Sequence, residues 1–470
     1  MPADLRCFLC GYSLRRCRAD EEKRHRDAAL QSEARLAGCL RRGWYSFNFR
    51  RLPARCSPAI GYNSRIRQSS TATKGDRMAA TIPAVREDQD FQTQNVLSIA
   101  WGHFTHDTYS AFVAPLLPLL IEKLSLSLTL VGTLTAISQL PAVLNPFIGY
   151  LADRVNVRWF IVLAPAATAT FASLLGLMPT YSAAAVLLLA MGVSVAAFHA
   201  PAPAAIARIA GHSTGKGMSW FMAAGEMGRT LGPLLAVWAV SAWTLEGMWP
   251  VMLLGWAASG ILLWRLQGVD VQPPKQESIR PILSHMGRVF LPLMFVVLFR
   301  NMLAVEVGTY MPTFLRQRGA ALWLAGGALS ILEAAGVVGA LVSGPLSDKL
   351  GRRTVLGGAI GSAALLMLAF LRVQGWVIFP LLLALGFTTL STQPVFLSLI
   401  QDHFPEHRAV ANGTYMSVSF LLRSVALFLV GVLGDHLGLE STYVIGAVVA
   451  LLALPALWLL PPEKHVEGAK

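Results

Sequence analysis

Long apolar stretches separated by short polar ones fill the chain from residue 97 onward. Most of them reach the roughly 20 residues that an α-helix needs to cross a bilayer. Lipid offers no hydrogen-bond partners, so a backbone segment that crosses it must pair with itself as a helix. The pattern therefore predicts an all-α membrane protein with twelve transmembrane helices, at residues 97–121, 126–149, 159–178, 181–207, 217–242, 248–266, 289–312, 322–346, 354–372, 376–400, 410–433 and 441–460.

One polar stretch between these helices occurs twice. It reads G-Y-L-A-D-R-V-N-V-R at Gly149–Arg158 and G-P-L-S-D-K-L-G-R-R at Gly344–Arg353, and its two aspartates, Asp153 and Asp348, lie 195 positions apart. Each copy follows a long apolar stretch and precedes another. A landmark that recurs at a fixed offset indicates a duplicated unit. We therefore expect two pseudo-symmetric bundles of six helices each.

Charge and composition define the domains that we expect. The chain is 54% hydrophobic and 14% charged, which is too apolar for a soluble protein of 470 residues. The loops on one side of the predicted helices, with the tail, hold fourteen Lys and Arg, against four on the other side, so both termini are predicted to be cytoplasmic. The expected parts are an N-terminal extension at 1–90, an N-terminal bundle at 91–266, a cytoplasmic linker at 267–288, a C-terminal bundle at 289–461 and a cytoplasmic tail at 462–470.

The first 77 residues differ from the rest of the chain. They hold 17 Lys and Arg against 7 Asp and Glu, and all five cysteines. Their single C-x-x-C lacks a second pair at zinc-ligand spacing, so we expect no metal and no cofactor. The Arg-rich composition could suggest an organelle transit peptide, but the acidic run at residues 20–22 argues against it. The favoured interpretation is a disordered extension, with Met78 as the true start.

Two six-helix halves, with the repeated stretch between the second and third helix of each, resemble the major facilitator superfamily. The stretch is similar to that superfamily's loop signature, G-x-L-x-D-R-x-G-R-R, although Asn156 replaces the inner glycine in the first copy. The resemblance implies that this motif latches the two halves on the cytoplasmic side; alternatively, its arginines only anchor the topology. The motif residues are Gly149, Asp153, Arg154, Arg158, Gly344, Asp348, Lys349, Gly351, Arg352 and Arg353.

Three further motifs resemble the fosmidomycin-resistance-like exporters of that superfamily. They are G-H-F-T-H-D in the first helix, A-F-H-A-P in the fourth and G-E-M-G-R-T-L-G-P in the fifth. The last one is also similar to the superfamily's antiporter motif at Gly228, Gly232 and Pro233, although Leu-Leu-Ala follows where glycines are expected. The resemblance favours exchange over uptake.

Ionisable residues inside the predicted helices are candidates for transport, because a charge in the bilayer needs a partner, water or a function. In the first helix His103, His106 and Asp107 are three and four residues apart and are expected to share one face. A carboxylate there is raised in pKa by desolvation and lowered by nearby cations, so Asp107 can take up and release a proton. The alternative is a polar cluster that only holds helices together.

The other candidates lie on later helices. Glu226 and Arg229 either neutralise each other or act in transport. The resemblance places the first and seventh helices around one cavity, so Arg300 is predicted to face Asp107 and to bind an anionic substrate, since a guanidinium bonds two oxygens at once. The remaining candidates of the proton and substrate pathway are His199, Glu306, Glu333 and Arg423.

These features predict a secondary-active transporter that is not an enzyme. The expected activity is proton-coupled export of a small drug-like or anionic compound, by rocking of the two halves in a bacterial inner membrane. No nucleotide-binding G-x-x-x-x-G-K-[ST] motif occurs, which argues against an ATP-driven pump. The expected partners are substrate, protons and lipid, without nucleic acid, and the protein is expected to be a monomer. Alternatives are an importer of an organic anion or nutrient, a non-transporting receptor and, more remotely, a metal-dependent intramembrane enzyme.

Overall fold

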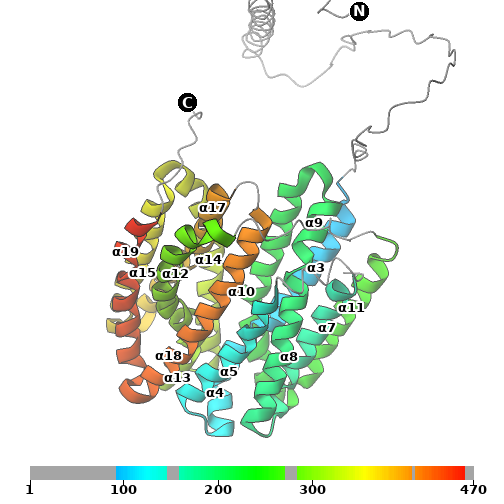
Figure 1. Ribbon diagram of the computed structural model, residues 1–470. Coiled ribbons are helices and arrows are strands. Elements are labelled where there is room, and N and C mark those ends of the chain that lie inside the picture. Colours follow the sequence, from blue (N-terminus) through cyan, green and yellow to red (C-terminus); the bar gives the residue numbers. More distant parts are fainter. Residues whose placement is uncertain (1–90, 146–157, 270–282, 405–407, 461–470) are drawn as a thin grey trace, which may run out of the picture. The chain divides into compact units, whose positions relative to one another are not determined.

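The computed structural model describes residues 91–145, 158–269, 283–404 and 408–460, all of them within one compact unit. Helices make up nearly all of this described part, and it contains no strand. Figure 1 shows them running side by side. The predicted extension at 1–90 and tail at 462–470, most of the linker, and the motif residues Gly149, Asp153 and Arg154 lie outside the described residues.

In the described residues of the first half, the helical segments form six successive passes. Several passes consist of two segments joined by a turn or a short 3₁₀ helix. The segments are α3 (Thr93–Ser110), α4 (Val113–Leu124), α5 (Leu128–Gln139), η1 (Leu140–Leu144), α7 (Arg158–Leu174), η2 (Leu175–Leu177), α8 (Tyr181–His199), α9 (Ala202–Ile209), η3 (Gly211–Ser213), α10 (Thr214–Gly247), η4 (Trp249–Val251) and α11 (Met252–Arg265).

The second half repeats this arrangement with another six passes in the described residues. One long segment, α18, holds two passes because the chain turns back at Gly438. The segments are α12 (Leu283–Val305), the π-helix η5 (Glu306–Tyr310), α13 (Met311–Gln317), α14 (Leu322–Leu350), α15 (Arg352–Arg372), η6 (Gly375–Val377), α16 (Ile378–Leu390), α17 (Thr392–His403), α18 (Arg408–Leu451), α19 (Ala453–Ala456) and η7 (Leu457–Leu459).

Backbone geometry repeats within one residue of the 195-position offset found in the sequence. Ser125 and Gly319 both have positive φ, and so do Thr244 and Gly438; the members of each pair lie 194 positions apart. These four residues form the turns between successive passes at one end of the bundle, which we call the outer end, following the predicted orientation. Positive φ is costly for Ser and Thr, so the same turn is kept even where glycine is absent. The duplication therefore extends from sequence to backbone conformation.

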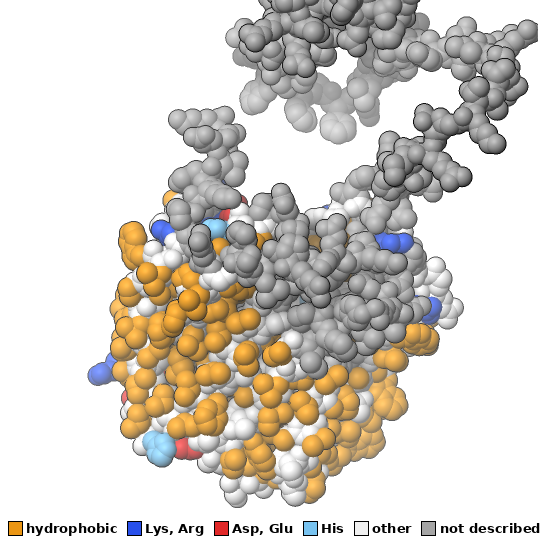
Figure 2. Space-filling model, in the orientation of Figure 1, with side chains coloured by type: hydrophobic (Ala, Val, Ile, Leu, Met, Phe, Trp, Pro, Cys, Tyr) orange, Lys and Arg blue, Asp and Glu red, His pale blue; other side chains and the backbone are white. Residues whose placement is uncertain are grey.

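The described surface is apolar, as expected for a bundle in lipid. Figure 2 shows hydrophobic side chains over most of the described part of one face, with few charged side chains among them. Large apolar side chains such as Leu341 and Trp458 are 72% and 81% exposed. Seven described segments are long and apolar enough to cross a membrane by length and composition. The first pass is not among these seven, and it is the pass that carries His103, His106 and Asp107.

The two halves pack closely along α5 and α18 near the outer end. The Asp435 carboxylate of α18 accepts hydrogen bonds from the backbone N–H groups of Leu128 and Thr129, both at 2.7 Å, and so caps the start of α5. A Cβ on Gly431 would lie 2.3 Å from the Leu128 carbonyl oxygen. One on Gly132 would lie 2.4 Å from a carbonyl oxygen of α18. These two helices can approach so closely because glycines stand at the contact.

Gly431→Ala is expected to separate α5 from α18 and to destabilise the protein by about 1–3 kcal/mol, the usual cost of overpacking. The added methyl group would meet backbone, which cannot move aside as a side chain can. Thermal unfolding of the purified protein measures the loss. Gly358→Ala is the matched control, because nothing lies within 4 Å of its Cβ position. Equal stability of the two variants would contradict this packing.

Candidate functional site

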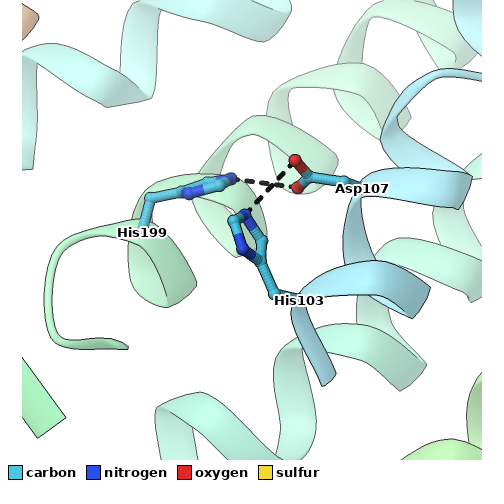
Figure 3. A group of neighbouring side chains, drawn as sticks. All are labelled: His103, Asp107 and His199. Atoms are coloured by element: carbon cyan, nitrogen blue, oxygen red, sulfur yellow. Dashed lines mark ion pairs between the residues drawn. The ribbon is translucent and has the colours of Figure 1, made fainter. Parts of the chain in front are cut away.

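A carboxylate between two imidazoles forms the centre of the candidate site (Figure 3). Asp107 Oδ2 lies 3.3 Å from His103 Nε2, one turn earlier on α3, and Asp107 Oδ1 lies 3.2 Å from His199 Nε2. Asp107 and His103 are buried at 5% and 3% exposure, whereas the His199 side chain is 34% exposed. His199 thus gives the buried pair an accessible edge. We call these three residues the histidine–aspartate cluster.

Local sequence explains how the three side chains meet. His103 and Asp107 are four residues apart on one helix, so they point the same way. His199 is the last residue of α8, and the chain breaks there because Pro201 follows two positions later. A Cβ on Gly225 would lie 2.3 Å from the His103 ring, so only glycine lets α10 pack against this imidazole.

The hydrogen bond of His103 and its close contact with Asp107 together indicate a proton on the pair that these two residues form. His103 Nδ1 lies 2.8 Å from the Phe221 carbonyl oxygen, which can only accept, so Nδ1 carries a hydrogen. A neutral imidazole has one N–H, and Nε2 would then face the carboxylate with a lone pair. The contact is attractive only if a second proton lies on Nε2 or on the carboxyl group. The geometry therefore indicates a pair that holds a proton.

His106 lies beside the histidine–aspartate cluster, where its ring packs edge-on against His199 with 5.3 Å between the ring centroids, and its part in a proton pathway stays a prediction. Its Nδ1 lies 3.1 Å from Thr168 Oγ1 on α7, and its ring stacks on Phe198. At three residues from His103 the helix turns about 300°, which is enough to direct the ring towards α7. His106 is fully buried and makes no contact with the Asp107 carboxylate in the described structure. Its surroundings are those of a polar packing residue.

A second charged group links α10 with α14. Arg229 donates a short hydrogen bond to Glu226, and its Nε lies 3.6 Å from Glu333 Oε2. The side chains of Arg229, Glu226 and Glu333 are 39%, 21% and 16% exposed. Glu226 and Arg229 belong to the predicted N-terminal bundle and Glu333 to the C-terminal one. One guanidinium thus joins two carboxylates across the two halves, a contact that the sequence did not reveal.

Three other predicted residues lie in the second half. Arg423 donates to Thr309 Oγ1 at 3.3 Å and interacts electrostatically with Glu333. Glu306, in the π-helix, is fully buried, and neither of its carboxylate oxygens has a hydrogen-bond partner in the described part of the chain. Arg300 is 9% exposed and lines a small cavity within this half, formed with residues of α15, α16, α17 and α18.

The repeated loop motif is described mainly in its second copy. Arg352 bonds Asp348 at 2.6 Å and Asp402 at 3.1 Å, so it ties α14, α15 and α17 together. Gly351 has φ of 89°, a conformation that favours glycine, and Arg353 donates to the carbonyl of Leu460. These contacts all lie within the second half. Whether the motif latches the halves therefore stays a prediction.

The other described members of the motif are Arg158, which donates to the Leu263 carbonyl at 3.2 Å, the partly buried Gly344 and the exposed Lys349.

The antiporter-like residues lie where α10 crosses α3. A Cβ on Gly228 or Gly232 would lie 2.4 Å from the carbonyl oxygen of Phe104 or Thr108. Pro233 follows inside α10 and is buried. The two glycines therefore bring Arg229 and its carboxylates close to the helix that carries Asp107. Packing alone accounts for the glycines in this structure.

The histidine–aspartate cluster also offers the kinds of atom that bind transition metals. Its three ligand atoms lie within 4.8 Å of one another. In each contact an imidazole nitrogen lies at ion-pair distance from a carboxylate oxygen, and we interpret the cluster as a proton site. The expectation that no metal binds stays a prediction.

Comparisons with known proteins agree with the observed fold. The family model "Major Facilitator Superfamily" matches residues 99–427. The Escherichia coli (strain K12) protein named "Fosmidomycin resistance protein" is 25% identical over 382 residues, which cover 78% of this chain and 93% of the relative. The "Gallate transporter" of Pseudomonas putida is 28% identical over 186 residues, 39% of this chain and 41% of the relative.

Solved structures share the fold. A bacterial homologue of the human lysosomal transporter Spinster, inward-facing and occupied, has a TM-score of 0.68 at 15% identity, covering 78% of this chain and 96% of that one. A D-xylose–proton symporter has a TM-score of 0.67 at 17% identity, covering 80% and 99%. These likenesses support the twelve-helix architecture.

Proposed function

The chain belongs to the major facilitator superfamily and is a multi-pass secondary transporter, and from this premise we propose that it couples export of a small anionic or amphiphilic compound to proton entry. The membrane would be a bacterial inner membrane, and the protein would act as a monomer.

The single observation that carries the proposal is the contact of the Asp107 carboxylate with His103 Nε2, because the other ring nitrogen of His103 already faces a carbonyl oxygen. Both residues are buried, so the bound proton is shielded from solvent. His199 contacts the other carboxylate oxygen and is partly exposed, which gives a proton a route to the pair. Imidazole exchanges protons near neutral pH, where a transporter has to load and release them. A carboxylate shared by two imidazoles is therefore well suited to proton coupling.

The charged group on α10 and α14 would connect the halves during the cycle. Arg229 contacts Glu333 of the other half, and this contact must change when the halves rock apart. Both Arg229 and Glu333 interact electrostatically with Asp107. A proton that arrives at or leaves Asp107 would thus alter the balance that holds α10 against α14. This provides a physical link between proton binding and conformation.

Export is favoured by the relative named for fosmidomycin resistance, since resistance to a compound can arise from its removal from the cell. The relative named as a gallate transporter supports an organic anion as the substrate class, and uptake of such an anion is the second candidate function. Both directions use the same proton site, so direction has to be measured.

A growth-inhibition panel on a sensitive bacterial host that expresses the chain tests export. The panel should include fosmidomycin and small aromatic acids. We expect resistance to one or a few anionic compounds, because the exported compound accumulates less in the cell. A host with equal amounts of the Asp107→Asn variant is the control. Unchanged sensitivity to every compound, with the protein correctly inserted, would contradict export and favour uptake.

A further inference from the structure

Arg300 lies beside a cavity within the second half of the chain. Its side chain is buried, and the cavity beside it is lined by residues of α12, α15, α16, α17 and α18, all in the second half. The other lining residues are Leu303, Ile360, Ala363, Thr388, Thr389, Thr392 and Ala450. The cavity is small, and its polar lining is confined to the guanidinium and three threonines.

Several hydrogen-bond donors around Arg300 have no acceptor in the described part of the chain. The guanidinium donates to the Thr389 carbonyl at 2.7 Å and to Asn301 Oδ1 at 3.2 Å. Its Nε, the Thr389 hydroxyl and Asn301 Nδ2 are buried and lack a partner. Thr389 and Asn301 are only 3% and 2% exposed. A buried donor without an acceptor is costly, so this set of donors calls for an acceptor that protein atoms do not supply.

The charge on Arg300 is also uncompensated. No carboxylate pairs with it among the described residues, and the charged side chain with which it interacts is another cation, Arg423. Arg229 and Arg352 differ from Arg300, since each of them contacts two carboxylates. Guanidinium stays protonated in proteins, so Arg300 cannot escape this cost by becoming neutral. A positive charge buried in a bundle needs a counter-ion.

We propose that the cavity beside Arg300 binds a small monovalent inorganic anion, chloride under physiological conditions. The guanidinium would neutralise the ion, and the free Thr389 hydroxyl would donate a hydrogen bond to it. Leu303, Ile360, Ala363 and Ala450 form the apolar remainder of the lining and leave no room for a larger organic acid. Chloride accepts hydrogen bonds from any direction, which suits a site built from donors alone.

Two neighbouring threonines offer a matched pair of variants. Thr389→Val removes the free hydroxyl, whereas Thr388→Val removes a hydroxyl already donated to the Ala384 carbonyl at 2.8 Å. Each hydroxyl has one hydrogen to donate, so only Thr389 can donate to a bound ion. Both changes keep the side-chain volume, and both residues line the same cavity. The pair therefore separates ion binding from packing.

The measurement is thermal unfolding of the purified full-length protein as chloride replaces gluconate at constant ionic strength. We expect saturable stabilisation by chloride and by bromide. Thr389→Val should raise the half-saturating concentration about tenfold or more, the usual effect of losing a hydrogen bond to a charge, while Thr388→Val should not. An anomalous bromide peak next to Arg300 in crystals would locate the ion.

Two results would overturn the proposal. Equal stability in chloride and gluconate would show that no halide site exists. Stabilisation by a transported acid in chloride-free medium, lost in Thr389→Val and absent with chloride, would assign the site to the substrate instead. Because the assay measures halide binding and not transport, its failure leaves the proton-coupled mechanism standing.

Discussion

Asp107→Asn should abolish proton-driven transport, reducing it to the level of vesicles that lack the protein. Asparagine has the size of aspartate but cannot ionise, so it cannot carry the proton that the contact with His103 requires. Its amide can donate a hydrogen bond to His103 Nε2 while Nδ1 still donates to the Phe221 carbonyl. The variant should therefore fold. Substrate accumulation in vesicles with an imposed pH gradient measures the loss.

Substrate exchange without a gradient supplies an internal control. The Asp107→Asn variant should retain exchange of labelled for unlabelled substrate, because that reaction needs alternating access but no net proton movement. Glu440→Gln is the matched removal of a carboxylate elsewhere. Glu440 is 63% exposed and pairs with Arg318 at the surface, where an ion pair contributes little. Full gradient-driven transport by Asp107→Asn would show that this carboxylate carries no coupled proton.

Arg229→Met should destabilise the protein by about 1–3 kcal/mol and shift it away from the state in which α10 contacts α14. The change leaves two carboxylates, Glu226 and Glu333, facing each other without their shared cation. The loss is expected to be smaller than for a fully buried pair because the Arg229 side chain is 39% exposed. Thermal unfolding measures the stability. Double electron–electron resonance between spin labels on the two halves measures the distance between the halves and so reports the conformation.

A double variant tests whether the lost contact between Arg229 and Glu333 causes the loss of stability. Adding Glu333→Gln to Arg229→Met removes the charge that the arginine neutralises across the halves, so part of the stability should return. Arg265→Met is the matched control: Arg265 is exposed at the end of α11 and only stacks on the neighbouring Trp264. If the double variant is as unstable as the sum of its single changes, Arg229 and Glu333 do not interact.

Much of the fold follows from the sequence because lipid restricts the backbone to helices. The apolar stretches predicted the passes, and the 195-residue offset of the polar motif predicted the duplication seen in the turns at Ser125, Thr244, Gly319 and Gly438. The helix breaks in the first and seventh passes were not visible in the pattern. They lie at residue 111 and in the π-helix beginning at Glu306, again 195 positions apart.

The candidate site was predictable only where one helix supplies it. The spacing of His103 and Asp107 is enough to predict their contact. Contacts between helices could not be derived, because helical spacing fixes a face but not the neighbour that it meets. This limit applies to His106 and Arg300, whose neighbours on other helices could not be named from their spacing along the chain. The same limit hid Glu333 as a partner of Arg229 and Thr168 as a partner of His106.

Direct observation of proton movement in reconstituted vesicles tests the central claim, that the pair of His103 and Asp107 couples a proton to transport. A pH-sensitive dye is enclosed in vesicles that hold the purified protein, and a transported compound is added without any imposed gradient. We predict a substrate-dependent pH change for the natural chain and none for Asp107→Asn. Substrate movement without a pH change in the natural chain would contradict the account.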